Sequence, residues 1–162
     1  MPAPLRIALV EPDIAGNTGN IARLCAATGA ELHLVEPLGF SLSDSRVRRA
    51  GLDYWDAVTL TRHRNYRSFE QSLAGQRILY FSTKATRSYL DIRYRPGDAL
   101  VFGSETQGLS EELLNGSPDC VLGIPMCRDN VRSLNVASAA AIVLYEALRQ
   151  IIGSGRASNT TG

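Results

Sequence analysis

Short apolar runs alternate with longer amphipathic segments along most of the chain. An apolar run of about four to eight residues is typical of a strand buried on both faces of a parallel sheet. Such runs predict strands at 5–10, 31–35, 57–60, 77–82, 98–102 and 120–124. The segments between them predict helices at 17–28, 42–50, 65–73 and 110–114. Strands that alternate with helices predict an α/β domain with a mostly parallel sheet flanked by helices.

The longest apolar segment begins near residue 133 and carries almost no charge. It is too apolar all round for a surface helix and too short for a membrane span. We therefore predict a central helix at 134–152, with Ser133 as its N-cap. The start of this helix brings Arg132, Ser133 and Asn135 next to the core, where polar groups need partners. Either the protein or a bound ligand supplies those partners.

The chain has 162 residues, which predicts one domain, 1–152. Residues 153–162 lack apolar anchors and are predicted to form a disordered tail. The N-terminus lacks the layout of a signal peptide, so we expect a cytoplasmic protein that does not associate with membranes. The three cysteines show no CxxC spacing, which argues against both a disulfide framework and a metal site.

Charge is unevenly distributed, although the net charge is only +1. Residues 41–98 hold eleven Lys or Arg against six Asp or Glu, a net +5, and the remainder holds six against ten, a net −4. Ten of the eleven cations are arginines, which suit bidentate contacts with phosphate. A solvated surface explains such a block equally well, so composition alone leaves nucleic-acid binding open.

Four loops that follow predicted strands are rich in Gly, Asn, Ser and Glu: 11–20, 82–86, 103–109 and 125–135. In open parallel sheets, ligands bind beyond the carboxyl ends of the strands. No GxGxxG or GxxxxGK[ST] pattern is present, so neither a Rossmann dinucleotide site nor a P-loop has support. The two glycines of 103–108 allow either close approach of the backbone to a ligand or a tight turn.

The first predicted helix has recognisable ends, with Asn17 or Thr18 as N-cap and Gly29 at the C′ position. Free backbone N–H groups and the helix dipole make such an N-terminus a place for an anion such as phosphate. Arg23 follows on the first turns of this helix. Ordinary capping and a surface arginine explain the same residues.

Taken together, these stretches resemble the SPOUT methyltransferases of the TrmH type, and within them the TrmL (YibK-like) group. The likeness covers almost all of residues 5–150. The segments that carry it are EPDIAGNTGNIARLCAATG, LHLVEPLGF, RRAGLDYWD, TRHRNY, STK, LVFGSETQGL, IPM and RSLNVASAAAIVLYEA. One departure is Gln107, where related enzymes often carry arginine for a possible phosphate contact. The loop 126–132 also looks one residue longer than in near relatives.

The resemblance implies a SPOUT fold whose C-terminal part forms a trefoil knot. It implies S-adenosylmethionine as the cofactor and no metal. The cofactor-binding positions that match the family are Phe81, Gly103, Ile124, Ser133 and Leu134. The enzymes of this family act as homodimers that share the active site across the interface. The implied reaction is 2′-O-methylation of the ribose of the wobble nucleotide, position 34, a cytidine or modified uridine in the anticodon loop of tRNA.

The resemblance also implies the catalytic group, with Arg23 as the catalytic residue and Asn17, Glu105 and Asn135 as the surrounding polar site. Guanidinium groups have pKa values above about 12 and are poor bases. Arg23 therefore either accepts the hydroxyl proton in an unusual site, or stabilises the developing alkoxide and fixes a phosphate. His63 is an alternative base, or a surface histidine within a basic RNA-binding patch.

Two other functions remain open at this point. The same methyl transfer could act on another RNA site, either a different tRNA position or ribosomal RNA, because the motifs serve the cofactor more than the substrate. A non-enzymatic nucleotide- or RNA-binding α/β domain is the alternative from another class. The presence of Arg23, Asn135 and the glycines of 103–108 disfavours that second alternative.

Overall fold

A single six-stranded sheet organises the computed structural model, which describes residues 3–51 and 54–159. The strand order is β3-β2-β1-β5-β4-β6, and every neighbouring pair is parallel. This confirms the predicted α/β class. The strands are β1 (Arg6–Val10), β2 (Glu31–Val35), β3 (Leu60–His63), β4 (Ile78–Phe81), β5 (Ala99–Phe102) and β6 (Val121–Leu122). The helices are α1 (Ala15–Thr28), α2 (Ser45–Gly51), α3 (Tyr66–Ser72), α4 (Glu111–Gly116) and α5 (Val136–Asn159), with 3-10 turns at Trp55–Ala57 and Pro118–Cys120.

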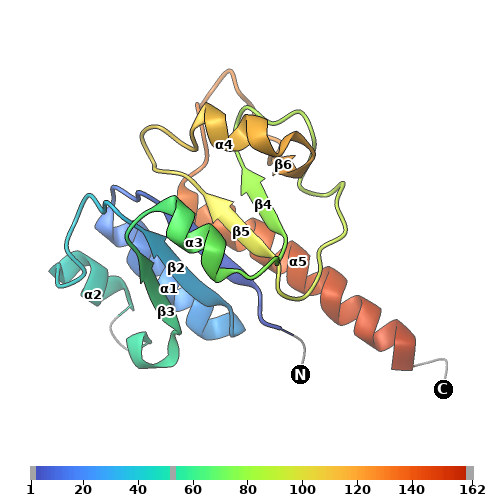
Figure 1. The fold of residues 1–162 in the computed structure, drawn as a ribbon, viewed down its shortest axis with the longest axis horizontal. Helices are drawn as coiled ribbons and strands as arrows, with labels where there is room; N and C mark the ends of the chain where they lie inside the picture. Colours follow the sequence, from blue (N-terminus) through green and yellow to red (C-terminus); the bar gives the residue numbers. More distant parts are fainter. Residues whose placement is uncertain (1–2, 52–53, 160–162) are drawn as a thin grey trace.

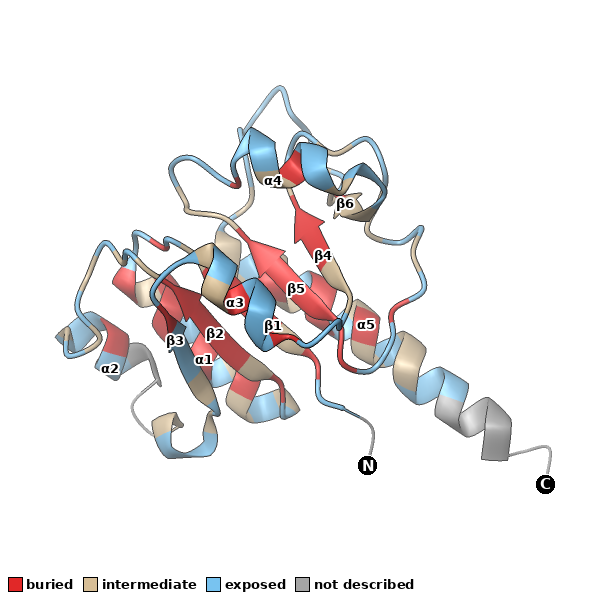
Figure 2. Ribbon diagram, viewed as in Figure 1, coloured by how far each residue is buried: buried red, intermediate tan, exposed pale blue. Residues whose placement is uncertain are grey.

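Helices cover both faces of the sheet, and each face has its own hydrophobic cluster (Figure 1). Side chains alternate between the two faces along each strand. In β1, Ile7 and Leu9 pack in the cluster under α1 and α5, while Ala8 packs in the cluster under α3 and α4. Most strands are buried along their length (Figure 2), as the apolar runs predict, whereas the edge strand β3 exposes Thr61 and Arg62. The carboxyl ends of all six strands therefore meet at one edge, with the four polar loops.

Helix α1 begins earlier than predicted and is capped differently. It starts at Ala15, so Asn17 and Thr18 lie inside its first turn and neither is the N-cap. The N-cap position is Ile14, whose side chain makes no capping hydrogen bond. The predicted end is confirmed, because Gly29 adopts the left-handed conformation and its N–H donates to the carbonyl of Cys25. The start of this helix therefore needs its acceptor from elsewhere in the fold.

The cap of α5 also differs from the prediction, because Asn135 takes the place assigned to Ser133. The side-chain Oδ1 of Asn135 accepts hydrogen bonds from the N–H groups of Ala137 at 2.8 Å and Ser138 at 3.3 Å. This is ordinary N-cap geometry, for which asparagine is a preferred residue. Ser133 lies two residues further upstream, in the loop.

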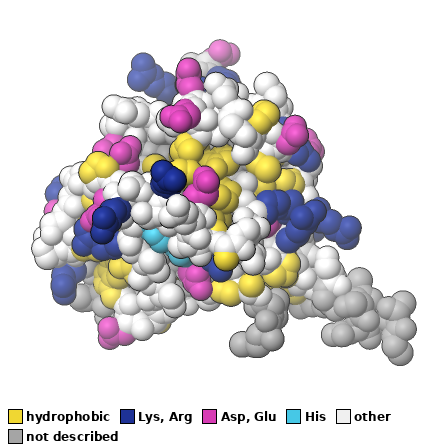
Figure 3. All heavy atoms as spheres, viewed as in Figure 1, with side chains coloured by type: hydrophobic (Ala, Val, Ile, Leu, Met, Phe, Trp, Pro, Cys, Tyr) yellow, Lys and Arg dark blue, Asp and Glu magenta, His cyan; other side chains and the backbone are white. Residues whose placement is uncertain are grey.

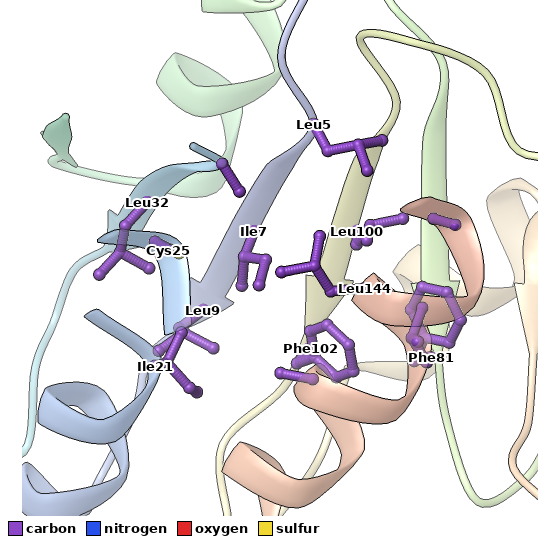
Figure 4. Packing of buried hydrophobic residues seen from close by; sticks show 14 of the residues in the cluster. Leu5, Ile7, Leu9, Ile21, Cys25, Leu32, Phe81, Leu100, Phe102 and Leu144 are labelled. Atoms are coloured by element: carbon purple, nitrogen blue, oxygen red, sulfur yellow. The ribbon is translucent and has the colours of Figure 1, made fainter. Parts of the chain in front are cut away.

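Only one side of α5 is buried, so the prediction of a helix enclosed all round is wrong. Its inner face packs against the sheet through Ala140, Val143, Leu144 and Ala147 (Figure 4 shows Leu144 among neighbouring core residues). Its outer face leaves Tyr145 54% exposed and Ile152 53% exposed. By length and composition alone, Val136–Ser154 could cross a membrane, but the core helices of soluble proteins meet the same criteria.

The domain boundary predicted at 152 stays a prediction, and the described part of the predicted tail is helical. The structure continues α5 as far as Asn159, so the described residues 153–159 extend the helix. A helix that is already nucleated gains one hydrogen bond for each residue added, and it needs no apolar anchor to propagate. Residues 160–162 of the predicted tail lie outside the described residues.

The smaller elements follow the sequence closely. Asn65 caps α3 by accepting from the N–H of Ser68 at 2.8 Å, and Ser110 caps α4 by accepting from the N–H of Leu113 at 3.3 Å. The third strand is shifted from the predicted 57–60 to Leu60–His63, because a 3-10 turn occupies Trp55–Ala57. The trefoil knot implied by the family resemblance stays a prediction.

Candidate active site

A cavity with a volume of about 760 Å³ lies at the carboxyl edge of the sheet. All four polar loops contribute to its wall, as the sequence predicts. They come from the ends of β1, β4, β5 and β6, whose parallel arrangement brings them to one edge. The lining residues used below are Ile14, Asn17, Phe81, Lys84, Gly103, Glu105, Thr106, Gln107, Ile124, Arg132, Ser133, Leu134 and Asn135.

The five residues predicted to bind a cofactor all line this cavity: Phe81, Gly103, Ile124, Ser133 and Leu134. The ring of Phe81 stacks on that of Phe102 with centroids 5.0 Å apart and an interplanar angle of 15°. Figure 4 shows the two aromatic residues side by side above α5. Neighbouring parallel strands supply them, because Phe81 of β4 is in register with Phe102 of β5. The sheet thus gives the cavity an aromatic floor.

Glu105, from the loop after β5, supplies the acceptor that the start of α1 lacks. Its carboxylate accepts from the backbone N–H of Asp13 at 2.7 Å and from that of Ile14 at 3.4 Å. Backbone N–H groups and the positive end of the helix dipole stabilise a negative charge there. The N-terminus of α1 is therefore an anion site, but the anion is this protein's own carboxylate. The phosphate that the sequence also allows at this helix end stays a prediction.

Asn17 joins Glu105 to the start of α5. Its Nδ2 donates to Glu105 Oε1 at 3.3 Å, and its Oδ1 accepts from Nδ2 of Asn135 at 2.9 Å. Asn17 is 7% exposed, so its amide is held almost entirely by these two partners. The chain Glu105–Asn17–Asn135 connects three of the four loops. These are three of the four residues predicted to be catalytic, and two of them, Asn17 and Asn135, are 118 residues apart in the sequence.

The glycines of 103–108 serve a tight turn. A side chain on Gly103 would place its Cβ 2.1 Å from the carbonyl carbon of Gly108 and 2.3 Å from the nitrogen of Leu109. Gly108 has φ +68°, and its N–H donates to the carbonyl of Ser104 at 2.9 Å. The loop folds back on itself so tightly that only glycine fits at residue 103. The sequence allowed either a close approach of the backbone to a ligand or a tight turn. The tight turn explains both glycines, and it carries Glu105.

Arg23, the fourth predicted catalytic residue, is not among the cavity-lining residues. It lies on the exposed side of α1, whose other side is buried through Ile21, Ala22 and Cys25. Its guanidinium carbon stands 5.0 Å from the centroid of the Tyr54 ring. Within one chain, the structure therefore separates Arg23 from the other three polar residues.

His63 fits neither of the roles considered from the sequence. It is 6% exposed, so it is not a surface histidine, and it does not line the cavity. Its Nε2 lies 2.9 Å from Nδ1 of His33, and the two rings stack with an interplanar angle of 8°. The second nitrogen of His33 lies 3.2 Å from Oε2 of Glu31. If Glu31 is ionised, it accepts from His33 Nε2–H, so the bare Nδ1 of His33 accepts from His63 Nε2–H.

Burial lowers the pKa of both histidines. For His33, desolvation is the main cause and the neighbouring Glu31 carboxylate opposes it. For His63, desolvation is again the main cause, and the nearby His33 adds to it. Phe69 closes the cluster, with its ring edge against both imidazoles. The pair is therefore neutral at neutral pH and serves packing between β2, β3 and α3.

The basic block 41–98 divides into arginines that hold the fold together and arginines that face solvent. Arg77 pairs with the buried Asp98 through two hydrogen bonds of 3.0 and 2.6 Å, and the ion pair raises the pKa of Arg77. Arg87 donates to the backbone carbonyls of Asp119 and Asp91. Apart from Arg87, which is itself exposed, the exposed arginines of the block are Arg46, Arg48, Arg49, Arg62, Arg64, Arg67, Arg93 and Arg95. Of these, Arg46 pairs with Asp44 and Arg62 with Glu36.

Figure 3 shows these cations in separate groups rather than one continuous patch. One group lies over α2 and β3, and another lies beside the loop between β4 and β5. Nucleic-acid contact by this block would therefore involve part of it at a time. Gln107, where relatives often carry arginine, is exposed on the cavity rim.

Three further residues lie at the cavity edge, and the sequence alone points only to Arg132 among them. Thr106 donates through its hydroxyl to Oδ2 of Asp13 at 2.6 Å, which ties the loop after β5 to the loop after β1. Lys84 and Arg132 place two cations at the cavity wall. The polarity of 82–86 and 132–135 pointed to these loops, but no spacing in the sequence pairs Asp13 with Thr106.

Metal-binding and thiol chemistry find little support in the described residues. Within residues 3–51 and 54–159, no three His, Cys, Asp or Glu side chains lie close enough together to be potential metal ligands. Cys25 is buried, and desolvation raises the pKa of its thiol to about 12. A thiol with such a pKa is inert as a nucleophile at neutral pH.

A protein-family comparison matches residues 4–145 to the SpoU rRNA Methylase family. Among curated relatives, the tRNA (cytidine(34)-2′-O)-methyltransferase of Escherichia coli (strain K12) is 47% identical over 148 residues, covering 91% of this chain and 94% of the relative. The protein of the same name from Saccharophagus degradans is 49% identical over 146 residues, covering 90% of this chain and 94% of the relative. These alignments span nearly the whole of each protein.

Solved structures agree with this family in fold. A structure described as giving insights into the 2-OH methylation of C/U34 on tRNA superposes with a TM-score of 0.88 at 45% identity, covering 94% of this chain and 99% of that one. The SpoU methyltransferase AviRb from Streptomyces viridochromogenes, in complex with AdoMet, gives 0.83 at 26% identity, covering 94% of this chain and 59% of that one. The match over 4–145, the relatives near half identity and the shared fold together place this chain in the SpoU methylase family.

Proposed function

We propose that this protein transfers the methyl group of S-adenosylmethionine to the ribose 2′-oxygen of the wobble nucleotide, position 34, of tRNA. The observation that carries the proposal is the convergence of Asn17, Glu105 and Asn135 at the wall of one large cavity. The names of the near relatives, which specify cytidine 34, support the substrate.

The cavity suits a cofactor of this size and chemistry. Its volume of about 760 Å³ falls in the range of roughly 300–1,000 Å³ that holds most cofactors and small ligands. Phe81, Ile124 and Leu134 give it apolar walls for a heterocycle, and the tight 103–109 turn presents backbone groups. When bound, S-adenosylmethionine supplies an electrophilic methyl carbon on a positively charged sulfur. Phe81, Gly103, Ile124, Ser133 and Leu134 are the residues that hold it in this proposal.

In this proposal, the chain Glu105–Asn17–Asn135 places ordered polar side chains beside the reacting atoms. In this reaction, the ribose 2′-oxygen would form the new bond to the methyl carbon, and the carbon–sulfur bond would break with its electron pair passing to sulfur. The hydroxyl proton would pass to water. Such a displacement depends on holding oxygen, carbon and sulfur in line. Asn17 and Asn135 are fixed by each other, and Glu105 is fixed by α1, so these groups are already ordered before substrate arrives.

Arg23 acts, in this proposal, on the nucleotide bound at the cavity of a second copy. The separation of Arg23 from the cavity lining within one chain supports this arrangement. The exposed apolar face of α5, with Ile142, Tyr145 and Ile152, supports a homodimer that buries it. Ile14, 48% exposed at the cavity edge, is a further apolar residue for such a contact.

The tRNA is held by the exposed arginines of the block 41–98, and the protein works in the cytoplasm, where tRNA is found. An anticodon loop offers unstacked bases and an accessible backbone. Binding through arginine–phosphate contacts weakens as salt rises, with a slope set by the number of contacts. Arg77 and Arg87 are excluded from this role because the fold already engages them.

The test is transfer of labelled methyl groups from S-adenosylmethionine to tRNA transcribed without modifications, followed by mapping of the labelled nucleotide. We expect label on the ribose of nucleotide 34. Arg23→Ala is the control, and it should lose about 100-fold or more in rate while S-adenosylmethionine binding is unchanged. Label on another tRNA nucleotide, or only on ribosomal RNA, would overturn the substrate and leave the methyltransferase. Unchanged turnover in Arg23→Ala would overturn the role of Arg23.

A further inference from the structure

We infer that Tyr54 is a positioning residue for Arg23: its ring orients the guanidinium outside the cavity. The inference rests on the proposed function, because it assigns Tyr54 a part in the same methyl transfer. Its basis is the 5.0 Å between the Arg23 guanidinium carbon and the Tyr54 ring centroid. A cation within about 6 Å of a ring centroid is attracted by the negative face of the ring.

Tyr54 is itself held in place by its neighbours. It immediately precedes the 3-10 turn Trp55–Ala57, and its carbonyl accepts from the N–H of Ala57 at 3.0 Å. Trp55 and Val58 pack against the hydrophobic cluster under α1 and α5. The ring of Tyr54 is half-buried, between this anchored turn and solvent. The backbone beneath the ring is therefore fixed even though the ring reaches the surface.

The backbone of Arg23 is held by helix α1, whereas its side chain is exposed. Its α-carbon lies on a helix whose inner face is buried, between Ala22 and Cys25, which are both at most 1% exposed. Its side chain is exposed, and among the described residues the Tyr54 ring is its one identified polar or aromatic contact. An unrestrained arginine side chain loses rotamer freedom when it is fixed. The Tyr54 ring therefore removes part of that freedom before RNA arrives.

The contact fits one of the two roles of Arg23 that the sequence left open. The negative face of an aromatic ring attracts a guanidinium cation. A cation held at a fixed position stabilises negative charge that develops on the 2′-oxygen or lies on a nearby phosphate. Tyr54 thus suits an Arg23 that acts by stabilising charge.

Two substitutions separate the ring from the hydroxyl of Tyr54. Tyr54→Leu removes the ring, and Tyr54→Phe keeps the ring and removes only the hydroxyl. We expect Tyr54→Leu to lower kcat about tenfold, since a misplaced catalytic group commonly costs that much or more. The KM for S-adenosylmethionine should not change, because Tyr54 does not line the cavity. Tyr54→Phe should stay within about twofold of wild type.

A double-mutant comparison shows whether Tyr54 acts through Arg23. In the Arg23→Ala background, measured by single turnover with excess enzyme, Tyr54→Leu should cause no further loss. A readout independent of activity is the ring-current shift of the Arg23 side-chain protons in arginine-labelled protein. That shift should be present in wild type and in Tyr54→Phe, and absent in Tyr54→Leu.

Three results would overturn the inference: an equal loss from Tyr54→Leu with and without Arg23, a Phe variant as slow as the Leu variant, or wild-type Arg23 protons without a ring-current shift. Failure of the proposed function is distinguishable from these results. If wild-type protein methylates no tRNA at nucleotide 34, the function falls, and the spectroscopic test of the ring contact still stands. If wild type is active and Tyr54→Leu equals it, the inference alone falls.

Discussion

Two polar clusters in this molecule draw on the residue types that catalysis uses, and the fold treats them in opposite ways. The His33–His63 pair is buried under Phe69 and does not line the cavity, and Nε2 of His33 lies against Glu31. The Glu105–Asn17–Asn135 chain lies at the wall of the cavity. Histidine is the usual acid or base, while asparagine and a capping glutamate look like ordinary helix-end residues. The position of the two clusters outweighs their residue types, because only the Glu105–Asn17–Asn135 chain lies where a substrate can reach it.

The two clusters also differ in what fixes them. The histidines are closed off by an aromatic ring and a carboxylate, and all their partners belong to the sheet and α3. The Glu105 chain joins the ends of β1, β5 and the loop before α5, so a change in any loop is felt by the others. Buried polar groups that are fully satisfied stabilise one structure. Satisfied polar groups beside a cavity are ordered and also accessible.

The largest expected effect that tests this comparison comes from Glu105→Ala. It removes the acceptor for the N–H groups of Asp13 and Ile14 and releases the amide of Asn17. We expect kcat to fall about 100-fold, since ordered polar groups beside the reacting atoms are lost. The free energy of unfolding should fall by only about 0.5–2 kcal/mol, which is the cost of losing a helix cap. Steady-state kinetics and urea unfolding measure the two effects.

Glu105→Gln is the matched control, because its amide oxygen can still accept one of these hydrogen bonds. It should recover most of the stability and part of the activity. A Glu105→Ala enzyme that loses stability but keeps its kcat would reduce this cluster to a helix cap, and the contrast with the histidines would disappear.

A smaller effect is expected from His63→Gln, which keeps a hydrogen-bond donor for His33 but does not titrate. The kcat of this variant at pH 7.5 should stay within about twofold of wild type, since His63 does not line the cavity. Its main effect should be on how stability varies with pH. Urea unfolding between pH 7.5 and pH 5 measures that dependence.

The sign follows from the lowered pKa values of both histidines. The unfolded chain, with histidine pKa near 6.5, binds protons more readily than the folded chain below that pH. Wild-type stability should therefore be complete above pH 6.5 and decrease as pH falls through the lowered folded pKa, by at most about 1.4 kcal/mol per pH unit for each proton. His63→Gln should show a shallower decrease. A large loss of kcat instead would make the buried pair part of the site.

Much of this fold can be predicted from the sequence, because local signals agree with it. Apolar runs identify the strands, and Asn65, Ser110 and Gly29 mark helix ends at or next to the observed positions. Where prediction fails, a distant partner has replaced a local one. The start of α1 needs no cap of its own because Glu105, 92 residues further along the chain from Asp13, provides the acceptor. No periodicity within a helix encodes such a partner.

The site divides in the same way. The polar loops and their meeting at one edge follow from parallel strands, so the lining residues Phe81, Ile124 and Leu134 can be expected. The family resemblance supplies Arg23, but not the Tyr54 ring beneath it, which comes from another segment. The burial of His63 depends on Phe69 of the following helix. Strand β3, which carries His63, is only four residues long, so its sequence pattern does not reveal that burial.

Mixing two inactive variants tests most directly whether Arg23 completes the cavity of a second copy. Arg23→Ala protein has intact cavities, and Ile124→Trp protein has an intact Arg23 but a filled cavity, which loss of S-adenosylmethionine binding would verify. Each alone should be inactive. After mixing and exchange of subunits, half of the dimers are mixed and each has one complete site, so about a quarter of wild-type activity should return. If the mixture stays as inactive as its parts, Arg23 does not act across the interface.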